Sequence, residues 1–191
     1  MSKARTDHSS FPIKLKLRQE NLPQGKCRVL DCFGGNGLLW NAIKKFNQQR
    51  EITVLRIDNE RGKNGIYLVG DNLKFLKNID LNNFDVIDLD SYGVPYKQLK
   101  CFFEKKSQRK ITVFLTFIQS IYGGLPRDFL CELGFTRKMV NKCPSLFYRK
   151  GFEKLKHYLA IHGVEKIKYY QNRSKRKNYL CFQTGKKAKR A

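Results

Sequence analysis

Acidic residues follow several short apolar segments of this sequence at corresponding positions. Asp58, Asp71 and Asp90 each come directly after, or one residue beyond, such a segment. Because the carboxyl ends of parallel strands share one edge of a sheet, where open α/β folds bind their ligands, we expect these acids to line one site. A carboxylate there can accept hydrogen bonds from an exocyclic amine, and Tyr92, close to Asp90, can stack on a flat base. These residue types could hold a flat base that carries an exocyclic amine.

A glycine-rich turn follows the first apolar segment. Residues 31–37 are Asp-Cys-Phe-Gly-Gly-Asn-Gly, between an apolar segment and an amphipathic helix over 37–46. Glycine allows the backbone to approach a ligand closely. Trp40 replaces the third glycine of a dinucleotide fingerprint, and no lysine of a phosphate-binding loop follows. An acid four residues before Gly35 instead suits a ligand that carries a positive charge.

Segment 29–37 resembles the first motif of class I S-adenosylmethionine-dependent methyltransferases, and the likeness extends over residues 27–120. It implies S-adenosyl-L-methionine as cofactor. The turn residues implied in binding its amino-acid part are Asp31, Phe33, Gly34, Gly35, Asn36 and Gly37. Asp58 would accept hydrogen bonds from the ribose hydroxyls, with Glu60 as its competitor. Asp71, with Asn72 beside it, would reach the adenine amino group. The alternative is that Asp58 and Asp71 only cap turns or helices.

Residues 87–95, Ile-Asp-Leu-Asp-Ser-Tyr-Gly-Val-Pro, are similar to the D-P-F/Y-G-S-P motif of tRNA guanine-N2 dimethyltransferases. They match the D/N-P-P-Y motif of amino-directed DNA and RNA methyltransferases more loosely. The positions that match, and that the likeness implies to be catalytic, are Asp90, Tyr92, Gly93 and Pro95. Ser91 and Val94 depart from the motif, so the likeness implies nitrogen methylation rather than one particular base. The alternative role for Asp90 is to cap its loop.

Three polar residues, Thr116, Gln119 and Ser120, end the apolar segment 111–117 near the same expected edge. They are candidates for substrate contact, although such residues more often satisfy loop backbone.

The net charge of +23 indicates a polyanionic partner. Residues 101–191 hold 22 of the 39 basic side chains and only 5 of the 16 acidic ones. The candidate nucleic-acid contacts are Arg137, Lys138, Lys142, Arg149 and Lys150 in one cluster and Arg173, Lys175, Arg176 and Lys177 in a second, beside Tyr169, Tyr170 and Tyr179. We expect RNA rather than DNA. The alternatives are a DNA amino-methyltransferase, a non-catalytic nucleic-acid-binding protein and, less favoured, a small-molecule methyltransferase.

The alternation of apolar segments and longer connections predicts an α/β protein with an open, mostly parallel Rossmann-like sheet and an antiparallel C-terminal hairpin. The expected strands are 27–33, 52–57, 66–69, 84–89 and 111–117, followed by a hairpin over 165–183; the expected helices are 37–46, 96–106, 126–133 and 144–161. Residues 1–24 are expected to form a basic arm, in which 13–17 could lie on a sheet edge or a nucleic-acid face. A single domain follows over 25–184, and a basic tail over 185–191.

Cysteine spacing argues against a metal site and against disulfides. None of the six cysteines forms a C-x-x-C pair, and the three histidines do not complete a zinc finger. We expect no metal and free thiols. No apolar run is long enough to span a membrane, and the first residues lack the apolar stretch of a secretory signal. These features predict a cytoplasmic protein that binds no membrane.

Overall fold

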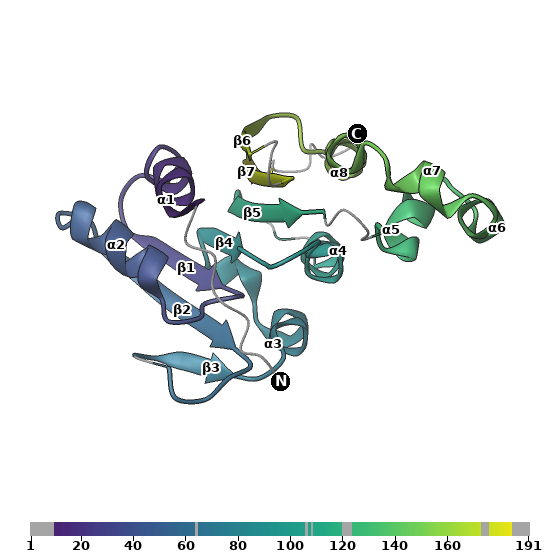
Figure 1. The fold of residues 1–191 in the computed structure, drawn as a ribbon. Coiled ribbons are helices and arrows are strands. Elements are labelled where there is room, and N and C mark those ends of the chain that lie inside the picture. Colours follow the sequence, from purple (N-terminus) through teal and green to yellow (C-terminus); the bar gives the residue numbers. More distant parts are fainter. Residues whose placement is uncertain are drawn as a thin grey trace, which may run out of the picture.

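The apolar segments of the sequence pair side by side in one mixed sheet (Figure 1). The computed structural model describes residues 10–63, 65–105, 107, 109–119, 124–172 and 176–184. The strands are β1 (Cys27–Asp31), β2 (Ile52–Asp58), β3 (Tyr67–Val69), β4 (Val86–Leu89), β5 (Thr112–Ile118), β6 (Ile167–Asn172) and β7 (Lys177–Gln183). Their order is β3-β2-β1-β4-β5-β7-β6. Neighbours from β3 to β5 are parallel, and β7 is antiparallel to both β5 and β6. The prediction of a mostly parallel α/β sheet with an antiparallel C-terminal hairpin is confirmed.

Strand register brings the acidic strand ends to one edge of the sheet. Asp31, the last residue of β1, is paired with Asp88 of β4 on one side and with Arg56 of β2 on the other. Asp58 follows Arg56 by two residues, and Asp90 follows Asp88 by two residues. Side chains two residues apart point to the same face of a strand, so Asp31, Asp88 and Asp90 face the same side of the sheet.

Helices cover both faces. They are α1 (Phe11–Gln19), α2 (Leu38–Phe46), α3 (Asn72–Asn78), α4 (Tyr96–Glu104), α5 (Arg127–Glu132), α6 (Arg137–Lys142), α7 (Pro144–Tyr148) and α8 (Gly151–Ile161), with a short 3-10 turn at Leu81–Asn83. Buried side chains of α1 and α2 pack with one face of the sheet, while those of α3, α4, α5 and α8 pack with the other. In the part of the chain that the structure describes, no helix is both long and apolar enough to cross a membrane.

The N-terminal segment differs from its prediction. Alternating apolar and basic residues over 13–17 suggested an extended chain, but the segment is part of α1. The helix forms because the same sequence also has helical spacing: Ile13 and Leu17 lie four residues apart and pack into the core shared with α2. The division into an arm of residues 1–24, a domain of 25–184 and a tail of 185–191 stays a prediction.

The segment 144–161 was expected to be one helix and is two. Lys150 adopts a left-handed conformation with φ of 53°, which interrupts the helical hydrogen bonds between α7 and α8. Arg149 and Lys150 therefore lie at a bend between two helices instead of along one helix.

A buried ion pair joins α1 to the centre of the sheet. Arg18 is 1% exposed, and its Nη2 and Nε donate to the two carboxylate oxygens of Asp88 at 2.6 and 2.8 Å. The indole Nε1 of Trp40 also donates to Asp88, at 2.9 Å. The Arg18 guanidinium lies 5.1 Å from the ring centroid of Phe114. Because both charges are buried and mutually satisfied, loss of either partner leaves an uncompensated charge in the core.

Arg18→Met should therefore destabilise the protein by about 3–5 kcal/mol, the cost of leaving one member of a buried ion pair alone. The measurement is chemical denaturation. Arg28→Met is the matched control, since the Arg28 side chain is exposed on β1. Arg18→Met with Asp88→Leu should recover part of the loss; equal stability of Arg18→Met and the wild type would contradict the role of this pair.

Candidate active site

Asp31 lies at the end of β1 and is only 6% exposed. Burial raises the pKa of its carboxyl group well above the ordinary value, and the nearby charge of Asp88 adds to the shift. Its Oδ1 accepts a hydrogen bond from the backbone N–H of Phe33 at 3.2 Å. A buried carboxylate with a raised pKa is compensated by a positive charge placed beside it. Such a group suits an ammonium-bearing ligand.

The glycines of the turn after β1 have different surroundings. Gly35 and Gly37 have φ values of +46° and +71°, which side chains rarely adopt. A Cβ on Gly35 would meet nothing within 4 Å, whereas one on Gly34 would lie 2.6 Å from Cβ of Arg56, and one on Gly37 would overlap the Arg56 guanidinium. Gly34 and Gly37 therefore make room for Arg56, while Gly35 faces open space where a ligand can approach. Asn36, between them, is exposed.

Arg56 was missed by the sequence analysis. It lies in β2 and is 7% exposed, and its Nη1 donates to the carbonyl of Gly35 at 3.4 Å. The guanidinium also lies 5.8 Å from the ring centroid of Tyr67. The available signal was a basic residue inside an otherwise apolar segment, Val-Leu-Arg-Ile, and such a residue needs a buried partner.

The acids after β2 and β3 make local capping contacts. Oδ1 of Asp58 accepts from the backbone N–H of Glu60 at 2.8 Å. The Glu60 carboxylate is exposed and pairs with Lys63 at 2.7 Å. Oδ1 of Asp71 accepts from the N–H of Leu73 at 2.8 Å and caps α3. Asp58 and Asp71 thus both make capping contacts, each through only one carboxylate oxygen.

Asn72 joins two parts of the site. Its side-chain amide donates to the carbonyl of Cys32 at 2.8 Å and accepts from Gln98 of α4 at 2.8 Å. These contacts tie the turn after β1 to α3 and α4. Asn72 therefore positions the glycine turn.

The loop after β4 is fixed to β5. Oγ of Ser91 donates to the carbonyl of Thr116 at 3.4 Å, and the N–H of Ile118 donates to the carbonyl of Gly93 at 2.9 Å. Gly93 has a φ of +123°, and Pro95, which is buried, precedes α4. Tyr92 is 90% exposed. The backbone of the loop is held while its aromatic ring is free to meet a partner.

Asp90 is the acid of this loop, and side chains from α1 and β5 contact its carboxylate. Nζ of Lys14 lies 2.8 Å from both of its carboxylate oxygens, and Oγ1 of Thr116 donates to Oδ1 at 2.5 Å. Nη2 of Arg18 is 3.9 Å from Oδ2. Burial alone would raise the pKa of Asp90, but the charges of Arg18 and Lys14, with the hydrogen bonds from Lys14 and Thr116, lower it below the ordinary value. Asp90 is thus an ionised hydrogen-bond acceptor.

Sequence analysis missed Lys14 and gave Thr116 little weight. Lys14 and Arg18 are four residues apart, so a helix brings them to one face. That spacing was the available signal, and the strand-like alternation over 13–17 obscured it. Gln119 lies just beyond β5, and Ser120 falls outside the described residues.

Comparison with solved structures finds many matches, while no family model and no curated protein matches the sequence. A protein from Bordetella parapertussis proposed to be exported has a TM-score of 0.58 at 11% identity, over 91% of this chain and 66% of that one. A protein from Plasmodium falciparum assigned as a ribosomal RNA methyltransferase has a TM-score of 0.54 at 13% identity, over 95% and 98%. TrmK of M. capricolum, in complex with S-adenosyl-homocysteine, has a TM-score of 0.50 at 11% identity, over 91% and 67%.

Other matching structures are the CurJ carbon methyltransferase and two proteins assigned as methyltransferases, one of them as class I and S-adenosylmethionine-dependent. This chain has a methyltransferase fold. The identities are too low to carry more than the fold. The chain spans about half to two thirds of the length of several of these structures.

In this methyltransferase fold, α5, α6 and α7 lie beyond the end of β5 (Figure 1). Aromatic packing attaches α5 to the candidate site, because Tyr96, the first residue of α4, has its ring centroid 5.5 Å from that of Phe129 in α5. The Tyr96 hydroxyl also donates to Glu132 at 2.6 Å. The start of α4 directly follows the loop that carries Asp90, so α5 lies close to that loop.

The predicted basic residues are distributed unevenly over this fold. Arg137, Lys138 and Lys142 are exposed on α6, Arg149 and Lys150 are exposed at the bend before α8, and Arg176 is exposed in the turn before β7. Arg137 pairs loosely with Asp128, at 3.7 Å. Lys177 was expected in an exposed hairpin tip but is the first residue of β7 and only 9% exposed, because strand pairing covers it. Arg173 and Lys175 lie outside the described residues.

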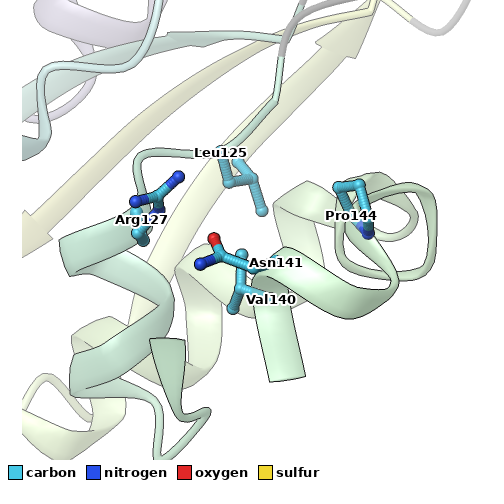
Figure 2. Close-up of a pocket in the computed structure, with 5 residues that line it drawn as sticks. All are labelled: Leu125, Arg127, Val140, Asn141 and Pro144. Atoms are coloured by element: carbon cyan, nitrogen blue, oxygen red, sulfur yellow. The ribbon is translucent and has the colours of Figure 1, made fainter. Parts of the chain in front are cut away.

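A hollow of about 600 Å³ opens between α5, α6 and α7 (Figure 2). It is lined by Leu125, Arg127, Val140, Asn141 and Pro144. Among the residues that the structure describes, no group of three or more His, Cys, Asp or Glu side chains could hold a metal ion.

The contact between Arg56 and the glycine turn predicts a specific coupling. Gly37→Ala should lower the free energy of unfolding by more in the wild type than in an Arg56→Ala background, because the shorter side chain removes the overlap. The difference should be about 1 kcal/mol or more in a double-mutant cycle. The cost of the positive φ is the same in both backgrounds and cancels.

Gly35→Ala is the control for this cycle. Its Cβ meets nothing, so it should cost the same with and without the Arg56 side chain. Coupling at Gly35 as strong as that at Gly37 would contradict the assignment of Arg56 as the filler of this space.

Proposed function

We propose that this protein is an S-adenosylmethionine-dependent methyltransferase acting on an exocyclic amine of an RNA base. The observation that carries the proposal is the loop after β4. Asp90 is ionised there, and Tyr92 is 90% exposed two residues later, at the same edge of the sheet as the open space over Gly35. A hydrogen-bond acceptor, a stacking surface and a cofactor turn are the parts that methylation of a base amine requires.

The residues of the turn after β1 fit the cofactor. Asp31 offers a buried carboxylate that a ligand ammonium would compensate, and Gly35 leaves space for close approach of a ligand. Asp58 is half-buried at the end of β2 and would accept hydrogen bonds from the ribose hydroxyls. Asp71 would reach the adenine amino group with the carboxylate oxygen that its cap leaves unused. When bound, the cofactor would supply an electrophilic methyl group carried on a sulfonium.

Asp90 would act on the amine. Its carboxylate would accept a hydrogen bond from one N–H, which turns the nitrogen lone pair toward the methyl group and stabilises the positive charge that develops on nitrogen. The same carboxylate would then accept the proton that the methylated nitrogen loses. Because the pKa of Asp90 is lowered, the group stays ionised at neutral pH and remains an acceptor. Tyr92 would hold the base by stacking. Gly93 and Pro95 would fix the loop that carries both side chains.

The electrostatics of the site favour a neutral amine. Lys14 and Arg18 already pair with Asp90 and Asp88, so the Asp90 carboxylate has less need of a further positive charge such as a protonated lysine side chain. The exocyclic amine of a base is uncharged. The exposed basic residues of α6 and of the bend before α8 would bind the phosphates around that base.

Guanine N2 in tRNA or rRNA is the specific target we propose, on the likeness of residues 87–95 to the guanine-N2 dimethyltransferase motif. The test is incubation of the protein with tritiated S-adenosylmethionine and, separately, total tRNA, rRNA and duplex DNA, followed by nucleoside analysis. Label in a methylated guanosine would support the proposal. Label only in DNA would make the protein a DNA amino-methyltransferase. Calorimetry showing no cofactor binding would leave a non-catalytic nucleic-acid-binding protein.

Asp90→Ala should lower methyl transfer at least about a hundredfold, the scale of a lost proton acceptor, with unchanged affinity for S-adenosylmethionine. Glu51→Ala is the control, because Glu51 lies at the opposite edge of the sheet and pairs with Lys26. The measurements are methyl transfer to RNA and cofactor calorimetry. Full activity of Asp90→Ala would remove Asp90 from the catalytic machinery.

Neutralising α6 should weaken RNA binding uniformly across sequences. With Arg137, Lys138 and Lys142 changed to Gln, the slope of log affinity against log salt should fall by up to about 2–3, since each phosphate that is no longer neutralised lowers it by close to one. Lys44→Gln with Lys45→Gln is the control, since both lysines are exposed at the C-terminal end of α2. An equal change in slope per positive charge removed in the two variants would mean that α6 is not a preferred phosphate-binding surface.

A further inference from the structure

We propose that Lys14 of α1 is a positioning residue of the methylation site, which fixes the Asp90 carboxylate in the one orientation that leaves an oxygen lone pair for the substrate amine. This inference rests on the proposed function. It makes α1, which precedes the strands of the sheet, a working part of the site.

The match between a helix and a strand carries the first step. Lys14 and Arg18 are one helical turn apart, about 6 Å along the axis. Asp88 and Asp90 are two residues apart, about 6.6 Å along a strand. Because the two spacings match, each cation reaches one acid. Arg18 lies 2.6 Å from Asp88, and Lys14 lies 2.8 Å from Asp90.

The ion pair of Arg18 with Asp88 holds the pair of Lys14 with Asp90 in place. Arg18 is buried and bound through two nitrogens to Asp88, and its Nη1 also donates to the carbonyl of Lys14 at 3.1 Å. The backbone of Lys14 is thereby fixed relative to β4. Its ammonium, on a side chain 21% exposed, lies over the ring of Tyr179 at 5.7 Å from the centroid. A lysine held at its base and along its length has few alternative positions.

The hydrogen-bond capacity of Asp90 carries the second step. An ionised carboxylate has about four lone-pair positions. Lys14 lies 2.8 Å from each oxygen, and Thr116 donates to Oδ1. Oδ1 is therefore satisfied by two donors and Oδ2 by one, with Arg18 beyond hydrogen-bond distance at 3.9 Å. The remaining position on Oδ2 is the acceptor for the substrate amine.

The charges that face Asp90 carry the third step. They are Lys14 and Arg18 from α1, Asp31 from β1 and Asp88 from β4, with the hydroxyl of Thr116 from β5 and the ring of Tyr179 from β7 beside them. Without Lys14, three carboxylates would share the single charge of Arg18. Asp90 would then protonate at higher pH, and in its protonated form it would lose capacity as an acceptor.

The experiment compares Lys14→Met with Lys16→Met and Lys14→Arg. Met is unbranched like lysine and only one atom shorter, but it has no charge and no donor. Lys16 lies on the same helix, and its exposed ammonium pairs with Glu20 at 3.8 Å, away from Asp90. The readouts are kcat and KM for RNA as functions of pH, the affinity for S-adenosylmethionine, and the titration of the Asp90 carboxyl group by carbon NMR, assigned with Asp90→Asn.

Lys14→Met should lower kcat by roughly tenfold to a hundredfold, as expected for a misplaced reactive group, with little change in KM or cofactor affinity. The acidic limb of the kcat profile, and the NMR titration of Asp90, should move to higher pH. Lys14→Arg should restore most of the rate and the position of that limb, and Lys16→Met should match the wild type.

An unchanged kcat profile in Lys14→Met, a loss equal to that of Lys16→Met, or a rise in activity would overturn the inference. A rise would mean that Lys14 obstructs the amine. If the wild type transfers no methyl group, the proposed function fails, whereas the NMR titration still tests Lys14: an unmoved Asp90 titration in Lys14→Met would overturn its role independently.

Discussion

Burial of carboxylates at the carboxyl ends of β1 and β4 is the constraint on which the rest of this structure depends. Asp88 is 1% exposed, and an ionised carboxylate at that depth is stable only with a partner that brings both charge and hydrogen bonds. Arg18 supplies both, and Trp40 adds a third donor. The pair fixes α1 to the sheet and sets which other residues of that helix can reach the adjacent acids. The position of Lys14 over Asp90 is a consequence of this pairing.

A second buried cation organises the other side of the site. Arg56 in β2 occupies the space beneath the turn after β1, where Gly34 and Gly37 have no side chains to exclude it. The glycines thus serve two purposes. Two of them accommodate a neighbouring side chain, and Gly35 alone opens toward solvent and a ligand. A count of glycines in a motif does not separate these roles, and only the packing of each position does.

The sequence predicted the sheet because most of its strands appear as short apolar segments, of which β4 and β5 are buried on both faces. It predicted the edge that carries the acids because strand direction fixes where carboxyl ends meet. It did not predict Lys14 or Arg56, since their partners are distant along the chain and a lone basic residue carries no sign of its partner. Alternation over 13–17 satisfies strand and helix patterns together, and burial of Leu17 decided between them. The break at Lys150 followed from a backbone conformation that residue type does not reveal.

Lys14 and Arg18, the two cations beside Asp90, set the chemical character of the site. A carboxylate exposed alone would attract ammonium ions, and a basic surface alone would bind any polyanion. Here Lys14 compensates the charge of Asp90, which stays ionised and retains its hydrogen-bonding capacity. Tyr92 projects from a loop anchored to β5, which provides a flat surface at a fixed distance from the acceptor. A nucleic-acid base, the substrate that we propose, would satisfy these features together, because it is a neutral, planar amine attached to a polyanion.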